Sequence, residues 1–203
     1  KDSTFYEHTI KELGLYLKNH FNPTELKKIR HVDFGGGFEV YKSEGYYPDK
    51  KAHDTALILE AITLEEYARE IGRAIRLNLK PLIDAVYYSE PGRIICNSAM
   101  HIVLSVADVK NKENVILNGG VNMVGWQRFE SEYFPLIDLS SISRKEIKCN
   151  MWGNLCTTWD IWGYHCYAKK IMKGDIIIVP NQGALTYSLA QSFIQPIPPV
   201  YKI

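Results

Sequence analysis

Gly35-Gly36-Gly37 is the first of three short motifs whose residue types could support chemistry. It directly follows His31–Phe34, an apolar and polar run typical of a strand. Three consecutive glycines let an anion such as phosphate come close to backbone N–H groups. No Gly-Lys-Ser/Thr follows, so the triplet is not a P-loop. Taken alone, it indicates either a phosphate cradle or a plain turn.

Glu90-Pro91-Gly92-Arg93 is the second motif, and it ends another predicted strand. A carboxylate and a guanidinium in one short turn suit a ligand with a cationic ring at one end and a phosphate at the other. In a parallel barrel, ligands bind at the carboxyl ends of the strands. A surface turn containing an ion pair explains the same four residues equally well.

The third motif is Gly153–Asp160, which contains Cys156 within a segment rich in tryptophan. A cysteine in such surroundings is commonly a small buried apolar residue. It could instead donate a proton at an apolar site, with Asp160 as its neighbour. No cysteine pair has the C-x-x-C spacing, and the set Cys149, Cys156, His165 and Cys166 matches no zinc pattern, so we predict no metal site.

Composition restricts the class of protein that carries these motifs. The chain has 203 residues, of which 46% are hydrophobic, enough for a packed core. A formal net charge of +1 gives no basic field for nucleic acid. We find neither a signal peptide nor an apolar run long enough to span a membrane. The sequence therefore predicts a cytoplasmic protein with no nucleic-acid or membrane partner.

The first two motifs lie in a region where helix and strand signals alternate. Apolar residues recur on one face at helical spacing over residues 4–18, namely Tyr6, Ile10, Leu13 and Leu17. Thr63–Glu66 forms a capping box that opens a helix lasting to about Lys80. A second strand, predicted over Leu82–Tyr87, follows it. This order is typical of a parallel α/β unit.

Beyond residue 93 the pattern changes to short strands separated by turns. We find no convincing long helix there, so residues 94–203 are predicted to form a mainly β domain. The strand-like segments are Val103–Val106, Asn114–Leu117, Ile147–Met151, Asp175–Pro180 and Thr186–Phe193.

The order of these motifs resembles the ornithine/diaminopimelate decarboxylase family, which has the fold-type III, alanine racemase-like fold. The family signature runs from a glycine triplet through Glu-Pro-Gly-Arg and Gly-x-x-Cys-x-x-x-Asp to Lys173-Gly174-Asp175 and Gly183-Ala184. The resemblance extends from Ser3 to about Pro199. It implies an α/β plus β fold, with residues 1–93 as the C-terminal portion of a (β/α)8 barrel that binds pyridoxal phosphate. Residues 94–203 would then be a β domain with a catalytic cysteine loop.

The resemblance also implies a role for each motif in the decarboxylation of an amino acid or a derivative of one. Glu90 would pair with the pyridine nitrogen of pyridoxal 5'-phosphate, which keeps the ring able to take up electrons when CO2 departs. Cys156 would act as the catalytic proton donor across a homodimer interface, with Asp160 as its companion. The cofactor phosphate would be held by Gly35, Gly36, Gly37, Gly92 and Arg93, and the substrate would contact Arg93 and Thr157.

Three positions depart from the family pattern. Leu185 replaces a tyrosine that binds the phosphate, and Tyr187, facing the same side in a strand, could replace it as a cofactor ligand. Thr157 replaces an acidic residue that reads the distal amino group of a basic substrate. Phe193-Ile194-Gln195 replaces Phe-Asn-Gly. These departures favour a divergent branch, some members of which act on carrier-bound aminoacyl groups.

In the family, the lysine that bonds the cofactor lies on the first barrel strand, upstream of the region resembled here. Two barrel strands cannot close a barrel. The resemblance therefore implies a partner, the N-terminal half with that lysine, and an isolated chain without activity. Two alternatives stay open: a catalytically inactive homologue that regulates a true decarboxylase as a heterodimer, and a racemase of the same fold.

Overall fold

The computed structural model describes residues 3–38, 43–45, 57–59, 62–111, 113–125 and 135–203. The chain divides into two compact units. The first unit is Lys1–Ser43 with Leu59–Ile95, and the second unit is Glu44–Ile58 with Cys96–Ile203. The domain boundary predicted after residue 93 stays a prediction.

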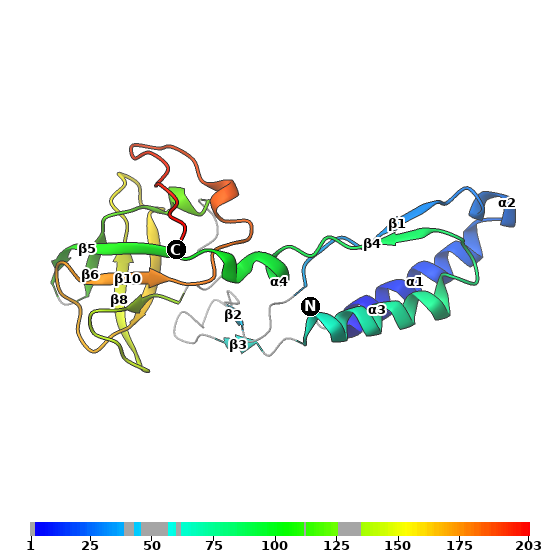
Figure 1. Ribbon diagram of the computed structural model, residues 1–203, viewed down its shortest axis with the longest axis horizontal. Helices are drawn as coiled ribbons and strands as arrows, with labels where there is room; N and C mark the ends of the chain where they lie inside the picture. The colour runs from blue at the N-terminus through cyan, green and yellow to red at the C-terminus, as the bar shows by residue number, and fades with distance from the viewer. Residues whose placement is uncertain (1–2, 39–42, 46–56, 60–61, 112, 126–134) are drawn as a thin grey trace. The chain divides into compact units, whose positions relative to one another are not determined.

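Two long helices pack against each other in the first unit (Figure 1). In α1 (Ser3–His20), the residues at helical spacing that we predicted to share a face include Tyr6 and Ile10, and both are buried. A Cβ at Gly14 would lie 2.6 Å from the carbonyl oxygen of Asn78, so glycine lets α1 approach α3 closely. The helices of this unit are α1, α2 (Pro23–Leu26), α3 (Leu64–Asn78) and α4 (Arg93–Cys96), the last reaching the boundary of the second unit.

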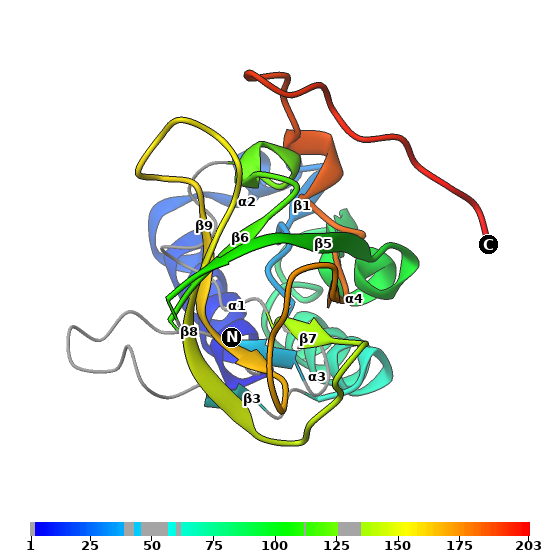
Figure 2. The same cartoon turned by 90° about the vertical axis from the view of Figure 1, so that its left-hand side faces the viewer.

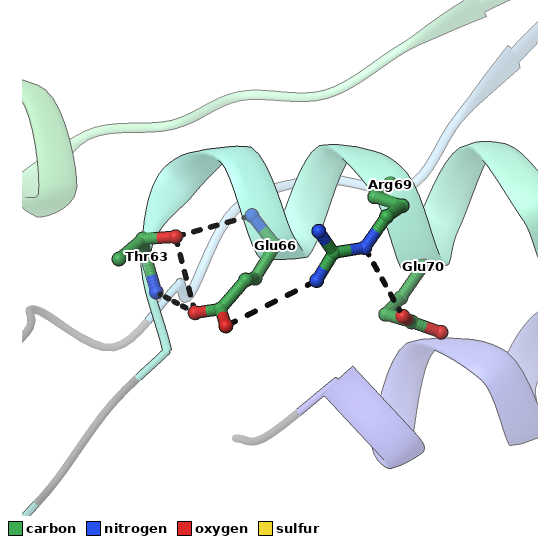
Figure 3. A network of polar contacts seen from close by, with 4 residues as sticks. All are labelled: Thr63, Glu66, Arg69 and Glu70. Atoms are coloured by element: carbon green, nitrogen blue, oxygen red, sulfur yellow. Dashed lines mark hydrogen bonds and ion pairs between the residues drawn. The ribbon is translucent and has the colours of Figure 1, made fainter.

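The start of α3 confirms the predicted capping box (Figure 3). The backbone N–H of Glu66 donates to Thr63 Oγ1 at 3.2 Å, and the backbone N–H of Thr63 donates to Glu66 Oε2 at 2.8 Å. The second bond is the main reason that the pKa of Glu66 lies below its usual value. Arg69 continues the network along the helix, with ion pairs to Glu66 at 3.9 Å and to Glu70 at 3.6 Å.

Strands β1 (His31–Asp33) and β4 (Val86–Tyr88) pair in parallel. Their register aligns His31 with Val86 and Asp33 with Tyr88. The strand predicted to begin at Leu82 begins four residues later (86 minus 82), so that expectation is wrong at its start. Turns after α3 use these apolar side chains for core packing instead, and Ile83 is buried there.

The second unit is a closed barrel with strand order β10-β5-β6-β8-β9-β7 (Figures 1 and 2). Its interior holds large buried side chains, among them Trp162, Leu117, Leu136, Met151 and Ile177. The barrel strands are β5 (Ile102–Lys110), β6 (Asn114–Leu117), β7 (Ile137–Asp138), β8 (Glu146–Trp152), β9 (Ile161–Tyr167) and β10 (Ile176–Val179).

Shorter elements complete the described structure. β2 (Ser43–Gly45) and β3 (Leu57–Leu59) form a separate two-stranded sheet. Among the described residues there are also the 3-10 helices η1 (Asn97–Ala99), η2 (Val121–Met123) and η3 (Tyr187–Leu189).

The mainly β character predicted beyond residue 93 is confirmed, although one predicted strand is wrong and β9 was not foreseen. Residues 186–193 form η3 and irregular structure instead of a strand. Leu185, just before this segment, has φ 57, a left-handed conformation that a strand does not contain. Within the described residues, no helix is both long and apolar enough to cross a membrane.

Candidate active site

The glycine triplet and the Glu90 motif lie side by side because they follow two paired parallel strands. The backbone N–H of Phe34 donates to Tyr88 O at 3.1 Å, and the backbone N–H of Glu90 donates to Gly35 O at 2.9 Å. These bonds continue the β1–β4 pairing beyond the strands. Residues distant in sequence therefore meet at one edge of the sheet, which we call the glycine cradle (Gly35–Gly37 with Glu90).

Close backbone packing requires glycine at the centre of the cradle. A Cβ on Gly36 would overlap the carbonyl oxygen of Glu90. Gly35 and Gly37 have φ 65 and 88, which glycine adopts without strain. Tyr6 fixes the loop from the α1 side, because its hydroxyl donates to Gly36 O at 3.0 Å.

The cradle has donors that fit an anion such as the phosphate of pyridoxal phosphate. The Gly35 N–H is taken up by Asp33 Oδ1 at 2.8 Å. In the part of the chain that the structure describes, the N–H groups of Gly36 and Gly37 have no hydrogen-bond acceptor. Successive N–H groups in a turn that includes a left-handed residue form an anion-binding concavity.

The rest of the Glu90 motif turns into α4. Ile95 N–H donates to Gly92 O at 3.0 Å, and Arg93 begins the short helix. A Cβ on Gly92 would meet open space, so steric contact does not explain the glycine. The Glu90 side chain is exposed and Arg93 is half-buried.

The second unit presents the cysteine loop, which we define as Gly153–Asp160 between β8 and β9. Cys156 is exposed and Thr157 is half-buried. The loop is closed at its base, where Gly153 N–H donates to Asp160 O at 2.9 Å. Trp159 is 53% exposed, whereas Trp162 is buried and donates from Nε1 to Gly119 O.

Asp160 lies inside the second unit. Its side chain is 2% exposed. Its oxygens accept hydrogen bonds from the backbone N–H of Val121 at 2.8 Å and of Leu155 at 2.6 Å. Burial raises the pKa of this carboxyl, and the two backbone hydrogen bonds oppose that effect. Asp160 stays a predicted site residue, but its carboxylate faces the protein interior.

Tyr187 lies in η3, so the strand predicted over Thr186–Phe193 is wrong there. Leu185 and Tyr187 therefore do not face the same side as alternate residues of a strand would. The Tyr187 hydroxyl donates to Pro198 O at 3.4 Å. A role for Tyr187 as a cofactor ligand therefore stays a prediction supported only by its position in the motif.

Two of the other cysteines belong to the core of the second unit. Cys149 and Cys166 are buried in the barrel core. Burial raises the pKa of Cys149 to about 12 and also raises the pKa of Cys166. Both thiols therefore stay protonated at neutral pH. Among the described residues, no group of three histidine, cysteine or acidic side chains is placed to hold a metal.

Sequence reasoning missed the partners of Asp160, which are backbone groups. Val121 lies in η2, on a turn after β6. The only local signals there are Gly119-Gly120 and Gly153, ordinary turn residues. The structure explains the glycine at position 153, because a Cβ there would overlap the Asp160 carboxylate.

A glycine turn at the ends of two parallel strands and a separate sheet barrel with an exposed cysteine loop agree with what the comparison with known families finds. The family model described as pyridoxal-dependent decarboxylase, C-terminal sheet domain, matches residues 19–183. The chain belongs to this family, whose cofactor is pyridoxal 5'-phosphate.

Two archaeal diaminopimelate decarboxylases are among the similar proteins. The enzyme of Methanothermobacter thermautotrophicus is 22% identical over 171 residues, covering 82% of this chain and 37% of the relative. The enzyme of Methanocaldococcus jannaschii is 24% identical over 200 residues, covering 94% and 40%. The chain therefore spans about two fifths of the length of these relatives.

Solved structures share the fold at low sequence identity. Diaminopimelate decarboxylase from M. jannaschii in complex with L-lysine has a TM-score of 0.67 at 19% identity, covering 96% of this chain and 43% of that one. Arginine decarboxylase of Paramecium bursaria Chlorella virus bound to agmatine has a TM-score of 0.68 at 16% identity, covering 98% and 50%.

Proposed function

We propose that this chain is the C-terminal half of an enzyme that decarboxylates an amino acid or an amino-acid derivative with pyridoxal 5'-phosphate. The observation that carries the proposal is the glycine cradle, where Glu90 N–H donates to Gly35 O just beyond the ends of β1 and β4, and where the Gly36 and Gly37 N–H groups have no acceptor among the described residues. Family membership supports the reaction class.

The cradle residues would bind and orient the cofactor. The Gly36 and Gly37 N–H groups donate to its phosphate, assisted by Gly92 and Arg93. The Glu90 carboxylate accepts from the protonated ring nitrogen and keeps that proton in place. When bound, pyridoxal phosphate supplies a ring that takes up the electron pair released as CO2 leaves.

Cys156 would complete the reaction by donating a proton. Its Sγ gives the proton to the carbon that has lost CO2, and the thiolate then regains one from solvent. The exposed position of Cys156 on the cysteine loop suits a group that works in the active site of a second protomer. A homodimer with shared active sites is therefore part of the proposal.

The remaining catalytic group, a lysine that bonds the cofactor, would come from an N-terminal half that is not in this sequence. The coverage of the relatives supports such a half, since the chain spans about two fifths of their length. Apolar side chains on β4 support it as well, because Val86 is 54% and Tyr88 45% exposed, which suits further strands of a (β/α)8 barrel. The chain alone should then bind cofactor weakly and lack turnover.

The substrate would have a neutral distal end. Thr157 stands beside Cys156, and the nearby Asp160 carboxylate is occupied by backbone donors. The described cysteine loop thus offers a hydroxyl and the Trp159 ring instead of an exposed acid. An amino acid without a distal ammonium, free or attached to a carrier protein, fits this surface.

The test combines the chain with an N-terminal half from a relative and follows the visible absorbance of bound pyridoxal phosphate and the release of CO2. We expect binding and turnover in the assembly, loss of binding in Glu90→Gln and Gly36→Ala, and normal binding with reduced turnover in Cys156→Ala. Gly72→Ala in α3 is the control, because its Cβ would make an ordinary contact with the Arg76 side chain at 3.5 Å. An assembly that forms a stable complex but binds no cofactor would contradict the proposal.

A second candidate function is an inactive homologue that regulates a true decarboxylase as a heterodimer. Leu185 and Thr157 favour it, because both replace polar residues of the family pattern. Cys156→Ala separates the two candidates: an enzyme loses turnover or product specificity, whereas a regulator keeps its effect on the partner's activity.

A further inference from the structure

The cysteine loop is held by one buried side chain. Asp160 Oδ2 accepts from the N–H of Leu155, the residue before Cys156, at 2.6 Å. Asp160 Oδ1 accepts from the N–H of Val121 in η2 at 2.8 Å. One carboxylate therefore ties the loop that bears the thiol to a turn that follows a different barrel strand.

Two glycines leave the space that the Asp160 carboxylate occupies. A Cβ on Gly153 would overlap both of its oxygens, and a Cβ on Gly120 would lie 2.9 Å from Oδ1. Gly153 N–H also donates to the Asp160 backbone carbonyl at 2.9 Å. Packing and hydrogen bonding thus fix Asp160, and through Leu155 they fix the start of the exposed part of the loop.

The same turn also holds the C-terminal segment that contains Tyr187. Asn122 is fully buried, and its Nδ2 donates to Gln191 O at 2.9 Å. Gln191 N–H donates back to Asn122 O at 2.9 Å. η2 is therefore a common anchor for two segments that contain predicted site residues.

We propose that Asp160 is a positioning residue that sets the place of the Cys156 thiol by holding the Leu155 and Val121 amides, with η2 as the anchor shared with the Tyr187 segment. The proposal rests on the proposed role of Cys156 as proton donor. A donor has to lie within hydrogen-bond reach of the atom it protonates, so a small displacement reduces the rate strongly. A side chain on an exposed loop gains that accuracy only from support behind it.

The hold of Asp160 on the Leu155 and Val121 amides, called the clamp below, can be tested by amide hydrogen exchange of this chain without measuring activity. In the wild type, the backbone amides of Leu155 and Val121 should exchange more slowly than the backbone amides of exposed residues of the cysteine loop, such as Thr158. In Asp160→Asn, the new amide NH2 cannot accept, so at least one of the two amides should exchange about tenfold faster. Asp138→Asn is the matched control, because Asp138 is buried in the same unit and its Oδ1 accepts from Ser140 instead.

The clamp would be overturned if the Leu155 and Val121 amides each exchanged at the same rate in Asp160→Asn as in the wild type. If Asp160→Asn does not fold, the wild-type protection pattern still decides, since unprotected Leu155 and Val121 amides would overturn it too. Asn122→Ala tests the shared anchor: exchange should rise at Gln191, and an unchanged Gln191 would refute that part.

Kinetics of the active assembly then test whether Asp160 acts through Cys156. Asp160→Asn should lower kcat by about tenfold with KM unchanged, and should cost nothing further in a Cys156→Ala background. A full additional loss in that background would refute the positioning role. If Cys156→Ala leaves turnover and product unchanged, the proposed function of Cys156 fails, while the exchange data still stand as a separate result on the clamp.

Discussion

The glycine cradle of the first unit and the cysteine loop of the second unit both contain candidate site residues, yet they are built in opposite ways. Backbone groups of two paired strands form the cradle, and Gly36 fits because it has no side chain. The cysteine loop depends on a side chain, the buried carboxylate of Asp160. The cradle should therefore be sensitive to an added Cβ, and the loop to the loss of a polar group.

The difference matches what each region has to do. A cofactor phosphate needs several fixed N–H donors at close range, which strand ends and glycines supply without side chains. A proton donor needs one accurately placed atom at the surface, and a loop can hold it there only if something inside the protein anchors the loop. The buried partner of an exposed functional residue is then part of the site.

Gly36→Ala should have the largest effect on stability. The new Cβ would overlap the Glu90 carbonyl oxygen, and neither strand end can move without breaking the Glu90–Gly35 hydrogen bond. We expect the free energy of unfolding to fall by about 2–3 kcal/mol, as in other overpacked sites. Urea denaturation followed by circular dichroism measures it.

Gly92→Ala is the matched control for the cradle. Its Cβ would meet open space, so the free energy of unfolding should change by less than about 0.5 kcal/mol. Equal losses in the two variants would show that the cradle is not defined by close backbone packing, and the contrast with the cysteine loop would fail.

Asp138→Asn should have a smaller effect and the opposite sign. Asp138 is fully buried, and among the described residues no donor reaches its Oδ2. Burial, with a contribution from Asp175, raises the pKa of Asp138 above its unfolded value. The folded protein thus binds this proton more tightly, so the ionised carboxylate costs stability at neutral pH and the cost disappears as the pH falls below the unfolded pKa.

Thermal unfolding at two pH values checks this sign. The melting temperature of Asp138→Asn should exceed that of the wild type by a few degrees at pH 7, and the gap should close below about pH 4, where carboxyls are protonated. Asp160→Asn should instead melt lower at pH 7 although burial also raises the pKa of Asp160, because the new NH2 group would face one of the two backbone N–H donors that the Asp160 oxygens accept from. Equal shifts for the two variants would mean that the bonds to Asp160 contribute nothing.

Local patterns in the sequence were sufficient to predict much of the first unit. The spacing of Tyr6 and Ile10 predicted the buried face of α1, and Thr63–Glu66 predicted the start of α3. Both signals act within one or two helical turns, where sequence neighbours are also neighbours in space. The glycine triplet and the Glu90 motif were predicted at strand ends, which the pairing of β1 with β4 confirms.

The second unit was less predictable because its contacts join distant residues. The Asp160 partner Val121 lies 39 positions away, and no local pattern links the two. β9 begins at Ile161, directly after the cysteine loop, and was not predicted because its residues do not alternate strictly between apolar and polar. Residues 186–193, whose composition suggests a strand, follow Leu185 at φ 57 and form η3 and irregular structure, so tertiary context overrode propensity there.

Thr63→Ala should change stability less than Gly36→Ala or Asp138→Asn does. It measures what a purely local signal, the capping box, contributes. It removes the acceptor of the Glu66 N–H and leaves the rest of α3 unchanged. The free energy of unfolding should fall by roughly 0.5–1 kcal/mol, while Thr63→Ser, which keeps the hydroxyl, should match the wild type.

Thr9→Ala provides the comparison within α1, since the Thr9 hydroxyl donates to the Phe5 carbonyl of its own helix in an exposed hydrogen bond. Its loss should lie within about 0.5 kcal/mol. A Thr63→Ala loss as large as that of Gly36→Ala would mean that α3 depends on its first turn as strongly as the cradle depends on close packing. Local capping would then rank with long-range packing in holding the first unit together, because α3 packs against α1 and the same helix pair carries Tyr6 to the glycine cradle.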